Sequence, residues 1–118
     1  EEMIKTHYFI VAVNQQSQIV GFSSITPQGY LHSMFVHKDF QGEGIATMLL
    51  EEIERYAITA GITRITSEVS LTARPFFEKK GYVVEKEQKR KANQLSLTNF
   101  LMAKEVAFLE YYNKKVTD

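Results

Sequence analysis

The residues best suited to chemistry stand together in one short stretch, Gln41-Gly42-Glu43-Gly44-Ile45-Ala46. Two glycines let the backbone turn tightly and direct successive N–H groups toward one point. An amphipathic helical pattern begins directly after Gly44, so these amides would meet the unpaired donors and positive dipole end of a helix N-terminus. Such an arrangement suits a phosphate or pyrophosphate. The stretch therefore predicts a binding site for a phosphorylated ligand.

Two ionisable side chains are candidates for proton transfer. His32 lies in the apolar run before the glycine stretch, and Glu68 lies near the end of a later β-branched run. An imidazole titrates near neutrality and could accept a proton directly or through water. The alternatives are a solvated or packed strand histidine and a solvated strand-end carboxylate. His7 and His37 are expected to be surface residues.

Composition bounds the class of protein. The 118 residues suffice for one domain, which we expect to span residues 1–118. Fourteen basic residues balance fourteen acidic ones, which gives no support for a nucleic-acid or membrane partner. The chain has no cysteine, which excludes a disulfide, a thiolate metal site and a cysteine nucleophile, and we expect no metal. No apolar run approaches the roughly 20 residues that cross a bilayer, and we expect a cytoplasmic location.

Three strands should precede the glycine stretch and one helix should follow it. Residues 8–13, 19–25 and 30–36 are β-branched and aromatic runs joined by short polar turns, which predicts a three-stranded antiparallel meander. Apolar residues then recur at helical spacing up to Gly61, where a helix commonly stops. Residues 62–69 read as a fourth strand. A strand, a long helix and a strand in one sheet predict a crossover to a parallel strand.

The last third of the chain predicts a short helix and a closing hairpin. Residues 72–80 form the helix, with Pro75 in its first turn, where no intrahelical N–H bond is lost. Residues 82–88 and 97–103 form the hairpin, around a basic polar loop at 89–94. The tail, 106–118, has the spacing of a short helix. The fold class is therefore α/β in the α+β sense, with a mixed, mostly antiparallel sheet.

Two other phosphate-binding motifs do not fit the glycine stretch. Thr47 stands where a dinucleotide-binding fingerprint has its third glycine, and a meander precedes the stretch instead of the first strand of a βαβ unit. A P-loop would need a Gly-Lys-Ser/Thr sequence, which does not follow. Ser33 and Ser67 have no adjacent histidine–acid arrangement that would make either a nucleophile.

Two motifs in order give the chain a resemblance to a known family. Gln41-Gly42-Glu43-Gly44-Ile45-Ala46 matches Q/R-x-x-G-x-G/A, and the segment from Ala73 to Tyr82, ARPFFEKKGY, is similar to A-x-x-F-Y-E-K-x-G-F. Both patterns, with an amphipathic helix and a strand between them, resemble the GCN5-related N-acetyltransferase (GNAT) family. The resemblance runs from about Tyr8 to Lys104, which is most of the chain.

The resemblance implies transfer of an acetyl group from acetyl-coenzyme A to a primary amine of a small molecule or protein. In this family the strand before the motif and the next strand splay apart, and the pantetheine arm enters the gap. Residues 41–47 would then receive the pyrophosphate, with the Glu43 side chain toward solvent. The resemblance assigns contacts with the cosubstrate to Met34, Phe35, Val36, Gln41, Gly42, Glu43, Gly44, Ile45, Ala46, Thr47 and Phe77. In serotonin N-acetyltransferases, a related family, a histidine at the position of His32 helps to take the amine proton.

The chain departs from the family pattern in two ways. The strand and helices that usually precede the first strand, and wall the acceptor site, are missing or minimal before Tyr8. Phe77 stands where many relatives carry a tyrosine that protonates the departing thiolate. A catalytically inactive coenzyme A-binding or regulatory protein of the same fold is therefore the alternative. A nucleic-acid module built on Lys86, Lys89, Arg90 and Lys91 is a weaker one. The acceptor amine stays unspecified, and a homodimer stays open.

Overall fold

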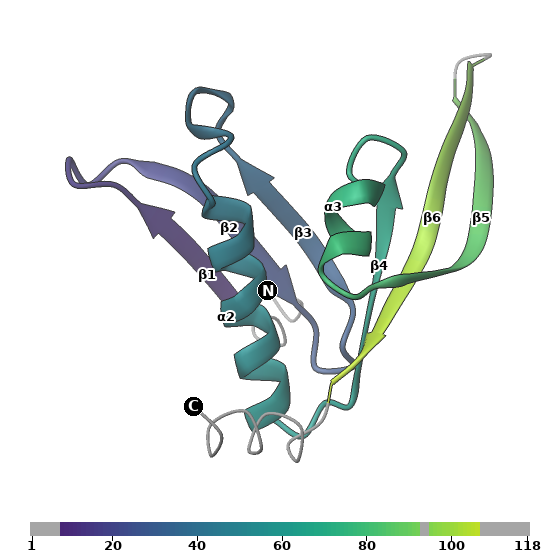
Figure 1. Ribbon diagram of the computed structural model, residues 1–118, viewed down its shortest axis with the longest axis horizontal. Helices are drawn as coiled ribbons and strands as arrows, with labels where there is room; N and C mark the ends of the chain where they lie inside the picture. Colours follow the sequence, from purple (N-terminus) through teal and green to yellow (C-terminus); the bar gives the residue numbers. More distant parts are fainter. Residues whose placement is uncertain (1–7, 93–94, 107–118) are drawn as a thin grey trace.

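The computed structural model describes residues 8–92 and 95–106, which form two small sheets and two α-helices (Figure 1). None of the helices in these ranges is long and apolar enough to cross a membrane. The elements in chain order are β1 (Tyr8–Val13), β2 (Ile19–Ile25), β3 (Leu31–Val36), the 3₁₀ turn η1 (Lys38–Phe40), α2 (Ile45–Thr59), β4 (Arg64–Ser70), α3 (Arg74–Lys79), β5 (Val83–Ala92) and β6 (Leu95–Glu105).

The first sheet has the order β1-β2-β3, with both pairs antiparallel, which confirms the predicted meander. Helix α2 covers one face of this sheet, and its first turns pack on Val20 through Ile45 and Leu49. This packing fixes the N-terminus of the helix beside the end of β3. The opposite face is apolar and exposed at Phe9, Val11, Val13, Phe22 and Phe35. The described part of the chain therefore leaves that face uncovered.

The second sheet has the order β4-β6-β5, and both pairs are antiparallel. The predicted closing hairpin is confirmed. The prediction of a loop at 89–94 is wrong, because strand pairing continues to Ala92–Leu95. A hairpin ribbon tolerates polar and basic side chains because its faces can be solvated, so composition alone misplaces the turn. Residues 93–94 and the tail expected to be helical, from residue 107 onward, lie outside the described residues.

Both helices form where the sequence patterns predict them, but the length of α3 differs from the prediction. Helix α2 ends at Thr59, and Ile62 N donates to Ala57 O at 2.8 Å just beyond it. Leu50 is buried on α2, whereas Met48 is exposed. Helix α3 is shorter than the predicted 72–80, because the chain first turns at residues 71–73 before the helix begins. Both helices still connect the expected strands.

The two sheets meet at a single parallel bridge between Tyr30 and Thr66 within the described residues. Thr66 N donates to Gly29 O at 2.9 Å, and Ser67 Oγ donates to Leu31 O at 3.1 Å. Beyond these contacts β3 and β4 belong to different sheets, which diverge in Figure 1. The predicted crossover to a parallel strand is therefore confirmed at one pair. The divergence leaves a gap between β3 and β4.

Substitution of Gly29 tests the importance of this joint. Gly29 has φ +93°, and an added Cβ would lie 2.3 Å from Arg64 O, on the chain entering β4. We expect Gly29→Ala to lower the free energy of unfolding by roughly 3 kcal/mol or more, through backbone strain and the steric clash together. Denaturant titration measures this loss.

Gly61→Ala is the matched control, because Gly61 has φ +82° and an added Cβ there meets no atom within 4 Å. Backbone strain alone should cost that variant about 1 kcal/mol. Equal losses in the two variants would show that the joint tolerates displacement.

Candidate active site

A cavity of about 520 Å³ lies where β3, the glycine stretch and α3 meet. Its volume falls within the roughly 300–1,000 Å³ of small-molecule sites. It is lined by Met34, Val36, Gln41, Gly42, Gly44, Ile45, Ala46, Thr47, Ala73, Phe76 and Phe77. The structure thus brings together all the residues expected to contact the cosubstrate except Phe35 and Glu43. No ionisable side chain is among these lining residues.

The glycine stretch forms one end of the cavity. Gly42 and Gly44 have φ values of +84° and +83°, and an added Cβ at either would meet no atom within 4 Å, so the space beside the turn is open. Gly44 caps α2, whose first intrahelical bond runs from Met48 N to Gly44 O. The N–H groups of residues 45–47 precede that bond, and neither an acidic residue nor a side-chain cap competes for them. This end of the cavity therefore fits an anion such as a pyrophosphate.

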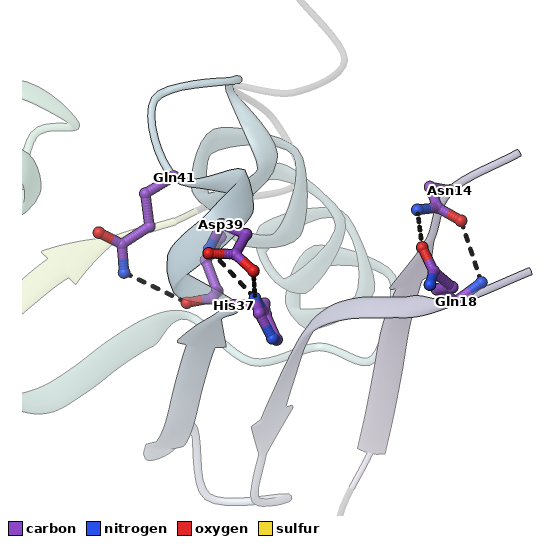
Figure 2. Close-up of polar contacts among 6 residues, drawn as sticks. Asn14, Gln18, His37, Asp39 and Gln41 are labelled. Atoms are coloured by element: carbon purple, nitrogen blue, oxygen red, sulfur yellow. Dashed lines mark hydrogen bonds and ion pairs between the residues drawn. The ribbon is translucent and has the colours of Figure 1, made fainter. Parts of the chain in front are cut away.

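Two side chains fix the path between β3 and the glycine stretch (Figure 2). Gln41 Nε2 donates to Val36 O at 3.3 Å, so the loop is tied to the last residue of the strand. His37 Nδ1 accepts a hydrogen bond from Asp39 N at 3.1 Å, and its ring packs edge-on against Phe40. His37 was expected to be a surface residue. It is only partly exposed, and it organises the turn that leads into the glycine stretch.

The opposite wall of the cavity is aromatic. Phe77 is buried, and its ring lies edge-to-face with Phe76 at 5.4 Å and with Tyr82 at 5.2 Å. Phe76 and Ala73 also line the cavity but were not predicted to contact a ligand. The sequence spacing could have predicted this role. Positions 73, 76 and 77 are spaced i, i+3 and i+4, so on a helix they share one face. An apolar wall of this kind suits the uncharged arm of a ligand whose anionic end lies at α2.

Behind this wall, Tyr82 is held by a polar cluster. Its hydroxyl donates to Glu54 Oε2 at 2.9 Å, and Lys104 Nζ donates to the same carboxylate at 3.2 Å. Burial raises the pKa of Tyr82 above its usual value, and the charge of Glu54 and the hydrogen bond to it raise the pKa further. The cluster links α2, β6 and the short segment between α3 and β5, and so supports Phe77 from behind.

The candidate proton-transfer residues lie beside the gap, outside the cavity lining. The joint pairs Tyr30 with Thr66 in parallel register. His32 and Glu68 each come two residues later, so by count they occupy equivalent positions on the two strands that border the gap. Both are exposed. The Phe35 side chain faces away from the cavity, on the uncovered side of its sheet, where it stacks on Phe22.

The remaining predictions concern the Glu43 side chain and metal binding. Glu43 is exposed and is not among the residues that line the cavity, as expected for a side chain that points to solvent. Within residues 8–92 and 95–106, no group of three or more His, Asp or Glu side chains is arranged to hold a metal ion.

Comparison with known sequences gives a family match and two curated relatives. A family described as "Acetyltransferase (GNAT) domain" matches residues 1–105. The uncharacterized N-acetyltransferase YafP of Escherichia coli K12 is 29% identical over 102 residues, covering 86% of this chain and 63% of YafP. The peptidyl-lysine N-acetyltransferase YjaB of Salmonella typhimurium LT2 is 32% identical over 74 residues, covering 63% of this chain and 49% of YjaB. The chain thus spans less than two thirds of either relative.

Comparison with solved structures supports the fold. A GCN5-related N-acetyltransferase from Rhodopseudomonas palustris superposes with a TM-score of 0.78 at 28% identity, covering 86% of this chain and 63% of that one. An aminoglycoside 6'-N-acetyltransferase solved in complex with coenzyme A has a TM-score of 0.75 at 22% identity, covering 88% of this chain and 76% of that one. The second likeness concerns the fold alone.

The Tyr82 cluster predicts a loss of stability in alkali. An unfolded tyrosine ionises near its ordinary pKa of 10.0, whereas the folded-state pKa of Tyr82 is raised. The stabilisation is therefore complete below about pH 10 and is lost as the pH rises above the unfolded pKa, because only the unfolded state then releases the proton. Denaturant titrations at pH 8, 10 and 11 should show this loss.

Tyr82→Phe removes the titrating group and keeps the ring against Phe77. We expect this variant to lose about 1 kcal/mol at pH 8, from the missing hydrogen bond. Its free energy of unfolding should then fall less steeply with pH than that of the wild type. Parallel pH profiles for the two proteins would contradict the assigned role of the Tyr82 hydroxyl.

Proposed function

This chain belongs to the GNAT acetyltransferase family, and from that premise we propose that it transfers the acetyl group of acetyl-coenzyme A to a primary amine of a small molecule or protein. The observation that carries the proposal is the cavity, which joins an anion-binding helix N-terminus to an apolar wall beside a gap between two strands. The whole reaction, its acceptor and its partners are part of the proposal.

The cavity supports coenzyme A as the ligand because its two ends match the two ends of that molecule. The pyrophosphate would accept hydrogen bonds from the N–H groups after Gly42 and Gly44. The pantetheine arm would lie along β3 against Phe76 and Phe77, with strand-like hydrogen bonds to backbone groups at the gap. The thioester would then reach the region of His32 and Glu68. Catalysis would rest largely on holding the thioester against the amine.

Proton transfer would use groups at the edge of the gap. An amine attacks a thioester only in its neutral form, so a base must take its proton directly or through water. His32 and Glu68 border the gap from opposite strands and are the proposed bases. Phe77 has no proton to donate to the leaving sulfur. Coenzyme A would therefore depart as a thiolate, which is feasible for a thiol with a pKa of about 8.5.

A catalytically inactive coenzyme A-binding protein is the second candidate. It is favoured by one observation, that the residues lining the cavity include no ionisable side chain. The names of the relatives widen the range of acceptors to test: YjaB is named a peptidyl-lysine acetyltransferase, and a structural neighbour is an aminoglycoside acetyltransferase. Lysine peptides and aminoglycosides are therefore the amines to test first.

Calorimetry with acetyl-coenzyme A tests the binding half of the proposal. We expect saturable binding by the wild type and a loss of about tenfold or more in Gly44→Glu, because the new carboxylate would stand beside the pyrophosphate. Gly61→Glu is the matched control, since it introduces the same side chain at a similar φ on the other end of α2. Equal affinities in the two variants, or no binding at millimolar ligand, would refute the site.

Release of free thiol in the amine panel tests the chemical half. For an amine that is turned over, His32→Ala or Glu68→Gln should lower kcat by roughly 10²-fold or more and leave the KM for acetyl-coenzyme A unchanged. Glu87→Gln, a change at an exposed residue of β5, is the control. Full turnover in both base variants would refute these bases. Binding without turnover of any amine would favour the second candidate.

A further inference from the structure

Two side-chain amide oxygens on the ribbon of β5 and β6 are buried without a hydrogen-bond partner. Within the described residues these atoms are Gln88 Oε1 and Asn99 Oδ1. The two residues pair directly across the ribbon, so their side chains leave the same face of the sheet. A buried acceptor without a donor is costly and is uncommon in folded proteins. Two such acceptors at one point therefore call for an explanation.

The register of the second sheet places this amide pair beside the gap. Glu68 of β4 pairs with Leu101, and Ser70, two residues further along, pairs with Asn99. Asn99 is thus a diagonal neighbour of Glu68 on one face of the sheet, at about 7–8 Å. Val69, between Glu68 and Ser70, packs into the core and so occupies the opposite face. One of the proposed bases and both amides therefore share the face that is directed away from the core.

The surface between the base and the amides is partly apolar. Leu101 is half-buried and stands between Glu68 on one side and Lys86 on the other, in one row across the three strands. The amide pair forms the next row, where the ribbon continues beyond the end of β4 (Figure 1). A ligand that reaches from Glu68 to the amides would therefore cross the Leu101 side chain.

A side-chain amide is suited to recognise a peptide group. It carries one acceptor and two N–H donors, whereas a main-chain peptide group has one acceptor and one donor. Gln88 and Asn99 are both only partly buried, and the terminal torsion of an amide side chain is broad. Rotation about this torsion can bring each oxygen to the surface when a donor arrives. The ligand would then supply the hydrogen bond that the fold does not.

The spacing on this face fits a lysine residue within a peptide. A lysine amine is joined to its main chain by a flexible four-carbon stem. With the amine at Glu68, that stem would lie over Leu101, and the peptide groups on either side of the lysine would reach the amide pair. Lys86 is exposed on the same face. A substrate with several ammonium groups would therefore meet a like charge there.

We propose that Asn99 and Gln88 bind the main-chain peptide groups of the acceptor, so that the acceptor class is a peptidyl lysine. The inference rests on the proposed function, since it takes the gap beside Glu68 as the place of acetyl transfer. Neither amide touches the reacting atoms. Both contribute to the affinity for the acceptor, and Lys86 lowers the affinity for amines that carry further positive charges.

Two amines that differ in their peptide groups test this assignment. Nα-acetyl-lysine methylamide carries a peptide group on each side of the lysine, and n-pentylamine presents the same amine on a bare chain. Wild-type kcat/KM should be roughly tenfold or more higher for the lysine derivative. Asn99→Leu and Gln88→Met should raise the KM for that derivative roughly tenfold at unchanged kcat, because uniform binding is lost. Neither variant should change the constants for n-pentylamine.

Thr98→Val is the matched control, because Thr98 neighbours Asn99 on β6 and its side chain leaves the other face. It should keep the wild-type constants for both amines. Lys86→Gln should lower the KM for kanamycin, an aminoglycoside with several ammonium groups, and leave that for n-pentylamine unchanged. If kanamycin is the better substrate of the wild type, the assigned acceptor class is wrong.

Denaturant titration separates a binding role from a structural one. Asn99→Leu removes an acceptor that has no donor in the fold, so its free energy of unfolding should equal or exceed that of the wild type. If Gln88 and Asn99 instead bond to each other, both variants should lose stability. Such a loss, with an unchanged KM for the lysine derivative, would assign the amides to the fold and overturn the inference.

Nuclear magnetic resonance gives a measure that needs no turnover. The side-chain NH₂ signals of Asn99 and Gln88, assigned by their absence in the two variants, should shift when Nα-acetyl-lysine methylamide is added to the protein with coenzyme A. They should not shift with n-pentylamine.

The outcomes separate this inference from the proposed function. If no amine is acetylated, the proposed function fails, and the NH₂ signals alone decide whether the amides bind a peptidyl lysine. If both amines are acetylated equally well, or both variants keep the wild-type KM for the lysine derivative, the inference is overturned and the proposed function stands. Shifted NH₂ signals with a raised KM for the lysine derivative alone support the inference.

Discussion

The arrangement of the candidate site depends on one main-chain hydrogen bond between the two sheets, from Thr66 N to Gly29 O. It closes the only parallel bridge in the described part of the chain. On one side of it the core is continuous, with Ile25 and Leu31 of the first sheet packed with Ile65 and the buried face of α2. On the other side the strands diverge. The two sheets separate beyond this bridge, and the cavity there is lined by β3, the glycine stretch with the start of α2, and α3.

Two strands that begin to pair usually continue to do so, because unpaired backbone groups are costly. Here side chains occupy the carbonyls that a longer ladder would use. Ser67 Oγ satisfies Leu31 O, which in a continued parallel ladder would accept the N–H of Glu68. Gln41 Nε2 satisfies Val36 O further along. Since both acceptors already have donors, closing the gap would gain little hydrogen bonding, and α3 stands beside the gap with Phe76 and Phe77 in the cavity wall.

The sequence predicted those parts that rest on local signals. The meander, both helices and the glycine turn depend on periodicity, turn residues and capping within a few positions, and the structure has all of them. The order of the elements also predicted the parallel crossover, but not how far the pairing between distant residues extends. Whether 89–92 is loop or strand depends on its pairing with β6, and the burial of Ser23 and Ser67 depends on packing between elements that no short pattern reveals. Phe35 was grouped with Met34 and Val36 because the strand was treated as one binding edge, although alternate side chains face opposite sides.

Binding and chemistry therefore have different structural origins in this fold. The anion-binding end is made by contiguous residues, 41–47, whose geometry follows from two glycines and a helix start. The gap where acetyl transfer would occur is made by segments about 35 residues apart in the chain, and its shape depends on the joint between the two sheets. A change that loosened the joint would misplace the thioester and leave the pyrophosphate contacts in place. For the same reason a fold of this kind can retain coenzyme A binding after losing turnover, so a bound cosubstrate does not by itself identify an enzyme. Turnover of an amine, measured beside binding, is therefore what would distinguish the two functions.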